Sequence, residues 1–200
     1  MLGLSERFGT RRPRRPGIVR ISALALACAL MVISAFASRG WGSSGAKHSK
    51  VETFNGSCDF AGTVTFDPPL SGSIQPTHAV ADLNGTCSGT LTRADGRAKR
   101  LDRARVRYHA ESQGDQSCGT SVASGAGFLD FKQARIDFTL SETRVGTVAP
   151  LDINGRAGGS FSGTATASGD PVATAAACAG PGLGRANVTI SGSTDPTISG

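Results

Sequence analysis

This 200-residue chain contains only three histidines, one tryptophan and one tyrosine. The nucleophile motif G-x-S-x-G, the zinc motif HExxH and the phosphate-binding loop are absent. No Cys-x-x-Cys pair, Cys/His cluster or calcium-loop pattern is present, so the sequence predicts neither a metal nor a cofactor. We therefore predict a protein that is not an enzyme, with an enzyme of unknown class as the least favoured alternative.

The few histidines have positions that favour structural roles over catalysis. His48 lies in a polar N-terminal stretch, and His78 is expected at the exposed start of a strand. His109 is expected opposite Asp82 on the polar face of a hairpin, where a cross-strand pair is more ordinary than a catalytic triad. The carboxylates are scattered, and no spacing holds two of them across a cleft. The sequence thus predicts no catalytic residue.

Positive charge is concentrated at the N-terminus, where residues 1–20 contain six arginines. An apolar run from Ile21 to Ala37 follows and ends in the small-residue pattern Ala35-Phe36-Ala37. This layout predicts an export signal over residues 1–37, cleaved after Ala37, and hence a secreted or cell-envelope protein with no membrane span in its mature form. A retained anchor is the alternative, although the apolar run is at the short limit for crossing a bilayer.

Removal of the signal changes the net charge of +6 to about +1, because 15 basic and 14 acidic side chains remain in residues 38–200. A nearly neutral protein has no global attraction for polyanions, so no nucleic-acid partner is expected. The small polar residues 38–50 are interpreted as a flexible linker, residues 51–192 as a β domain, and residues 193–200 as a loose tail.

Short runs of alternating apolar and polar residues recur through the β domain, and no stretch shows helical periodicity. Phe60, Val64 and Phe66 share one face of such a run, and Val172, Thr174, Ala176 and Cys178 are interpreted as another strand. The chain has 27 glycines, many of them between or within these runs. The pattern predicts an all-β fold of about eight or nine antiparallel strands, arranged as a barrel or a two-sheet sandwich.

One hairpin can be predicted together with its register. Asp95-Gly96 indicates a two-residue type I′ turn, because glycine tolerates a positive φ there. The resulting cross-strand pairs are Leu83–Tyr108, Gly85–Val106 and Cys87–Ala104 on the apolar face, and Asn84–Arg107, Thr86–Arg105 and Ser88–Arg103 on the polar face. A slip by one residue would mix the two faces, so the pattern favours this register.

Four cysteines remain after the signal, namely Cys58, Cys87, Cys118 and Cys178. An even number of cysteines in an exported chain indicates disulfides, here two of them, for which three pairings are possible. Cys58 and Cys87 lie on the apolar faces of consecutive strands, which a turn around residues 67–77 would bring together. We therefore favour Cys58–Cys87, which leaves Cys118 to pair with Cys178.

Three segments carry a resemblance to known proteins. Residues 58–70 read CDFAGTVTFDPPL, residues 83–89 read LNGTCSG, and Gly155 is followed by GSFSG at residues 159–163. Together they make the chain similar to a group of small exported β-rich proteins of actinobacteria. The resemblance covers most of the mature chain and implies a compact β fold, but it implies no activity. The aromatic residue that the resemblance implies before the strand at 134–140 is not a tryptophan in this chain. Either Phe128 or Phe131 is expected to take its place.

A local excess of positive charge lies between Arg93 and Arg107, with seven basic and two acidic residues. Arg103, Arg105 and Arg107 are expected in one outward row, with neighbours about 7 Å apart along the strand. Such a row suits an anionic envelope polymer or headgroup, although exposed charge also prevents edge-to-edge aggregation.

Two functions follow from these patterns. We first predict a non-enzymatic exported domain that binds a cell-envelope or extracellular partner, with an anionic partner suggested by the arginine row. The alternative is a β-barrel carrier of a small apolar ligand, since inward glycine and alanine residues would leave a cavity in a barrel. The same small residues would equally allow two sheets of a sandwich to pack closely.

Overall fold

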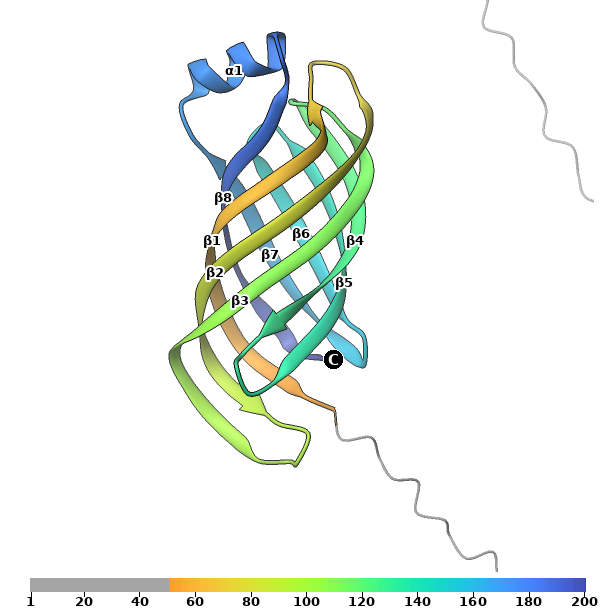
Figure 1. The fold of residues 1–200 in the computed structure, drawn as a ribbon. Helices are drawn as coiled ribbons and strands as arrows, with labels where there is room; N and C mark the ends of the chain where they lie inside the picture. The colour runs from red at the N-terminus through yellow and green to blue at the C-terminus, as the bar shows by residue number, and fades with distance from the viewer. Residues whose placement is uncertain (1–50) are drawn as a thin grey trace, which may run out of the picture. The chain divides into compact units, whose positions relative to one another are not determined.

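The computed structural model describes residues 51–200, and within them eight antiparallel strands close into a barrel (Figure 1). The strands follow one another around the barrel in chain order, and β8 closes it by pairing with β1. The prediction of an all-β fold is therefore confirmed, and its form is the barrel. The predicted export signal (1–37) and linker (38–50) lie outside the described residues.

The barrel consists of long strands with short connections. In chain order its elements are β1 (Thr53–Leu70), β2 (Gln75–Thr92), β3 (Ala98–Gln116), β4 (Thr120–Asp130), β5 (Arg135–Val145), β6 (Val148–Gly155), β7 (Gly158–Ser168), α1 (Pro171–Ala179) and β8 (Leu183–Ser199). Because β4 pairs with β3 only as far as Arg107, the β2–β3 hairpin projects beyond the end of the barrel opposite α1 (Figure 1).

Large apolar side chains fill the part of the barrel interior that lies away from α1. Alternate residues of each strand point inward, as the two-residue period of a strand requires. The rings of Phe54 and Phe131 have their centroids 5.1 Å apart, and Tyr108 lies between Phe60 and Phe138 at 5.6 and 5.4 Å. All five side chains are buried. This end of the barrel is thus a packed core.

The β2–β3 hairpin keeps the predicted register over the barrel but not at its turn. The five pairs from Leu83–Tyr108 to Cys87–Ala104 are confirmed. The predicted type I′ turn is wrong: the Gly96 amide donates to the Arg93 carbonyl at 2.8 Å, and the loop contains three residues, 94–96. A bulge at Asp102 and Arg103 compensates for the longer loop, and so the ladder returns to the predicted register beyond it.

Arg103 is affected by this bulge. The predicted Ser88–Arg103 pair is wrong, because pairing passes from Cys87–Ala104 directly to Gly89–Leu101. Arg103 has a φ of 47° and its amide donates to the Ser88 hydroxyl at 3.0 Å. Arg103 is therefore not a regular member of the arginine row.

Residues 172–178 form part of helix α1, so the prediction of a strand there is wrong. Asp170 caps the helix, since its carboxylate accepts a hydrogen bond of 2.8 Å from the Val172 amide. Pro171 occupies the first helical turn, where its missing N–H is not needed, and alanines with high helix propensity follow. In so short a segment, alternation of small residues does not distinguish a strand from a helix.

The C-terminal residues 193–199 belong to β8, so the prediction of a loose tail is also wrong. Ile198 is fully buried and pairs with Phe54 of β1 and Gly159 of β7. Residues 193–199 are mostly polar or small. Backbone pairing with β1 on one side and with β7 on the other holds this segment in place and closes the barrel. Local composition does not reveal this kind of stabilisation.

Both predicted disulfides are confirmed. Cys58–Cys87 joins β1 to β2 inside the barrel, with Cα atoms 4.1 Å apart. Cys118–Cys178 joins the β3–β4 turn to α1, with Cα atoms 6.1 Å apart. Two disulfides are compatible with an extracellular protein. In residues 51–200, no helix has both the length and the apolar character needed to cross a membrane.

Candidate functional site

The part of the barrel interior next to α1 contains a cavity of about 130 Å³. Its wall is mainly apolar and includes seven alanines from β2, β3, β6, β7 and β8, namely Ala79, Ala81, Ala110, Ala149, Ala165, Ala167 and Ala186. A methyl group does not reach the barrel axis as the aromatic rings of the other half do. The cavity therefore exists because the small inward residues lie near α1, whereas the large inward residues lie in the other half of the barrel.

The cavity wall also contains polar side chains, namely Tyr108, Ser112, Glu142, Arg144, Thr147 and Thr174. One Glu142 oxygen accepts a hydrogen bond of 3.0 Å from the Ser121 hydroxyl, while its other oxygen has no hydrogen-bond partner among the described residues. The Tyr108 hydroxyl also makes no hydrogen bond to the described residues, although the side chain is only 2% exposed. Burial, and to a smaller extent the nearby Glu142 charge, raises the pKa of Tyr108, so this hydroxyl stays protonated.

Arg144 also borders the cavity, but its guanidinium is engaged by the backbone. One terminal nitrogen donates to the carbonyls of Cys118 and Gly146 at 2.9 and 3.0 Å, and the other donates to the Ser117 carbonyl. Partial burial lowers the pKa of Arg144, against which the Glu142 charge acts. The side chain thus ties the β3–β4 and β5–β6 turns together and partly balances the charge of Glu142.

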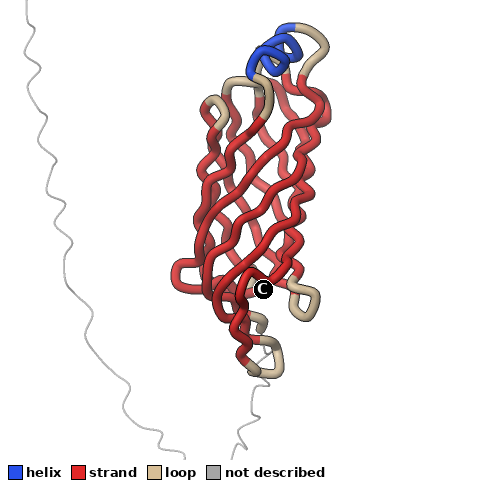
Figure 2. Tube along the Cα trace, turned by 90° about the vertical axis from the view of Figure 1, so that its left-hand side faces the viewer, coloured by secondary structure: helices blue, strands red, loops and turns tan. Residues whose placement is uncertain are grey.

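Helix α1 lies over the end of the barrel at which the cavity opens (Figure 2). Thr174 of the helix contributes to the cavity wall, yet no residue of α1 is buried. The helix is therefore held less by packing than by its chain connections and the Cys118–Cys178 disulfide.

The turns around the cavity opening are uncharged, and exposed apolar residues lie near them. Of the six exposed large apolar residues in the described part of the chain, five lie at this end, namely Ile74, Val122, Val145, Val148 and Val172. The turns at residues 71–74, 117–119 and 146–147 contain no charged side chain. These turns therefore add no charge of their own that would attract or repel a molecule entering the cavity.

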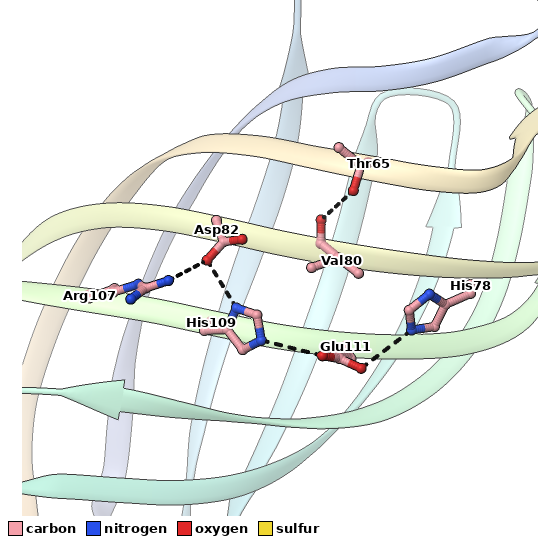
Figure 3. A network of polar contacts seen from close by, with 7 residues as sticks. All are labelled: Thr65, His78, Val80, Asp82, Arg107, His109 and Glu111. Carbon is pink, nitrogen blue, oxygen red and sulfur yellow. Dashed lines mark hydrogen bonds and ion pairs between the residues drawn. The ribbon is translucent and has the colours of Figure 1, made fainter.

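A chain of polar contacts crosses the outer face of β2 and β3 (Figure 3). One Asp82 oxygen accepts hydrogen bonds from Arg107 and His109, both at 2.9 Å. The other His109 ring nitrogen is 3.6 Å from Glu111, which is also 3.5 Å from His78. The bonds from His109 and then from Arg107 lower the pKa of Asp82.

This contact chain confirms the predicted pair of His109 with Asp82. Both ring nitrogens of His109 face carboxylates, so neither faces a hydroxyl nucleophile as a catalytic triad requires. The network is exposed, with half of the Asp82 side chain open to solvent. It is an arrangement of surface ion pairs, which contribute little to stability individually.

The three arginines predicted to bind anions are all exposed, but they do not form a uniform row. Arg107 is paired with Asp82, and Arg103 lies in the bulge. Arg105 makes no ion pair within residues 51–200 and borders an open groove together with Arg107 and Lys132. The structure thus adds Lys132, from the β4–β5 turn, to the basic surface, and anion binding there stays a prediction.

Glu142 and Arg144 were not singled out by the sequence patterns. They continue the inward series that begins with Ile136, Phe138 and Leu140, because strand residues two apart share a face. Charged residues at inward positions of a predicted strand would have been the signal for a polar group inside the barrel.

Comparisons of the chain with family models, with curated proteins and with solved structures found no match. Among residues 51–200, no group of three or more histidine, cysteine or acidic side chains is placed to hold a metal ion.

Proposed function

We propose that the protein is an exported carrier that binds a small, mainly apolar molecule inside its barrel. The supporting observation is the alanine-lined cavity below α1. A barrel whose interior was filled throughout would instead favour binding at the outer surface. The predicted export signal and the two disulfides support a role outside the cytoplasm.

The cavity volume limits the size of the ligand. A protein cavity of about 150 Å³ lined by aliphatic side chains holds benzene, so about 130 Å³ corresponds to a single ring or a short branched chain. A long acyl chain would not fit unless α1 moved away. The exposed aliphatic residues around the opening are compatible with entry of such a molecule.

Titration of the purified, oxidised protein with four compounds of one shape tests this proposal. Toluene, benzyl alcohol, benzylamine and benzoate share a ring of the expected size and differ in their polar group. Amide NMR spectra should change at inward positions of β2, β3 and β7, and native mass spectrometry should show one molecule bound. If none of the four compounds changes these signals at millimolar concentration, the protein does not carry ligands of this class.

A second function, binding of an anionic envelope polymer, is favoured by a separate observation. Arg105 and Lys132 border one groove and neither makes an ion pair with the described residues. Asp130 also lines the groove, but its carboxylate accepts a hydrogen bond from the Lys132 amide, so the side chains of Arg105 and Lys132 stay available to phosphate or carboxylate groups of a polymer.

Reversing these two charges should weaken binding to an anionic polymer. The Arg105→Glu, Lys132→Glu variant should elute from immobilised teichoic acid at clearly lower salt than the wild type, with unchanged thermal stability. The Arg156→Glu, Arg185→Glu variant has the same net charge, and its substituted residues are exposed at other places on the barrel. If both variants elute at the same salt concentration, the groove has no specific role, and only net charge matters.

A further inference from the structure

The polar groups of the cavity indicate which ligands it would select, if the protein is a carrier as proposed above. Glu142 has one carboxylate oxygen bound to Ser121 and one without a partner. Glu142 is partly buried and lines the cavity, so its second oxygen is available to accept a hydrogen bond from a bound molecule.

The Tyr108 hydroxyl is a second group on the cavity wall that makes no hydrogen bond to the described residues. Its ring is held between Phe60 and Phe138, so its position is fixed by packing. The hydroxyl can both donate and accept, and it lines the same cavity as Glu142. A ligand hydroxyl that donates to Glu142 would thus be near a second group able to donate to it.

The charges around the cavity argue against an ionic ligand. An acid would lose its hydration beside the Glu142 carboxylate, and the terminal nitrogens of Arg144 already donate to backbone carbonyls and so offer it little in return. Arg144 already provides an opposite charge, so an ammonium group would lose its hydration without facing an uncompensated anion. The turns around the opening contain no charged residue that would attract either ion.

We infer that the cavity selects small neutral molecules with one hydroxyl group, namely alcohols or phenols with a compact apolar body. The apolar body lies among the alanines, and the hydroxyl donates to Glu142 beside Tyr108. The opening below α1 admits the molecule without charge-based attraction. This inference specifies the ligand class of the proposed carrier.

Comparison of benzyl alcohol with toluene tests the role of the hydroxyl. Calorimetric titration of the wild type at neutral pH should give about tenfold tighter binding of benzyl alcohol, as expected for a hydrogen bond to a charged acceptor. Benzylamine and benzoate, which are ionised at this pH, should bind more weakly than benzyl alcohol.

Two variants assign the preference to the proposed residues. Glu142→Gln should reduce the preference for benzyl alcohol over toluene severalfold while keeping the side-chain shape and an oxygen that accepts from Ser121. Tyr108→Phe should reduce it by a smaller factor, with toluene affinity nearly unchanged. Glu111→Gln makes the same chemical change on the outer face of the barrel, where 60% of the side chain is exposed, and should have no effect.

The outcomes separate this inference from the proposed function. If toluene binds as tightly as benzyl alcohol, or an ion binds most tightly, the hydroxyl selection is wrong while the carrier function stands. If Glu142→Gln and Glu111→Gln change the preference equally, Glu142 is not the acceptor. If none of the compounds binds the wild type, both the carrier function and its ligand class are wrong.

Discussion

Replacing Ala81 and Ala110 together with leucine is expected to weaken binding of benzyl alcohol by at least about a hundredfold. These alanines are paired with each other on β2 and β3 and both line the cavity. Two isobutyl side chains would occupy much of a space of about 130 Å³, and the ligand would have to displace them. Titration calorimetry with benzyl alcohol measures the loss.

The stability of this variant should distinguish a filled cavity from a damaged core. Each added methylene that becomes buried contributes about 0.8 kcal/mol, so the free energy of unfolding should stay level or rise, provided that the leucines fit. Urea denaturation measures this free energy. A fall of several kcal/mol would mean that the space is smaller than described, and the loss of binding would then say nothing about a site.

A matched pair of substitutions on the outside provides the control. Ala61 lies on β1 and Ala126 on β4, and both are at outward-facing positions, opposite Asn84 and Glu111. Neither alanine lines the cavity. Leucine at both positions adds the same apolar atoms without entering the barrel, so benzyl alcohol affinity should be unchanged. Equal loss of affinity in both double variants would contradict an internal site.

Replacing Cys58 and Cys87 together with alanine is expected to lower the free energy of unfolding by about 3–4 kcal/mol. The disulfide spans 29 residues of sequence, so its removal increases the entropy of the unfolded chain. Both sulfur atoms also lie in the core, where the side chains are 2% and 1% exposed, so alanine leaves unfilled space. Urea denaturation of the oxidised wild type and the variant measures the difference.

The Cys118→Ala, Cys178→Ala variant provides the comparison. Its disulfide spans 60 residues, and chain entropy alone would give it the slightly larger effect on unfolding. However, α1 buries no residue, so the unbridged helix should detach locally and become open to cleavage by thermolysin near Val172. The Cys58–Cys87 variant should remain resistant there. A loss below about 1 kcal/mol for the Cys58–Cys87 variant would show that the stability of the barrel depends little on this bridge.

The arrangement of the first hairpins was predictable because it depends on local patterns. Alternation in residues 83–91 and 104–108 specifies which side chains face inward, and a shift by one residue would expose Leu83 and Tyr108. The positions of Cys58 and Cys87 on the apolar faces follow from the same period. The type of turn mattered less, since the bulge at Arg103 absorbed the extra loop residue.

Helix α1 and the C-terminal strand were predicted wrongly for different reasons. The helix has a recognisable start at Asp170-Pro171, but its small residues show no apolar face because none is buried. The segment around Ile198 has a polar composition, and only its pairing with β1 and β7 gives it order. In the first case a local signal was present, whereas in the second case the cause lies in residues far away in the sequence.

The sequence by itself determined the β class and the register of the second hairpin as far as its bulge, and it favoured the two disulfide pairs that the structure contains. Only the tertiary structure decided that the strands close into a barrel, through pairing of β1 with β8 across more than a hundred residues. Closure places alanines of five strands around one space and brings Tyr108 and Glu142 into its wall. The two-residue period of a strand predicts whether a side chain faces inward or outward. Which inward side chains of different strands lie at the same level along the barrel axis depends on the tilt and stagger of the closed barrel.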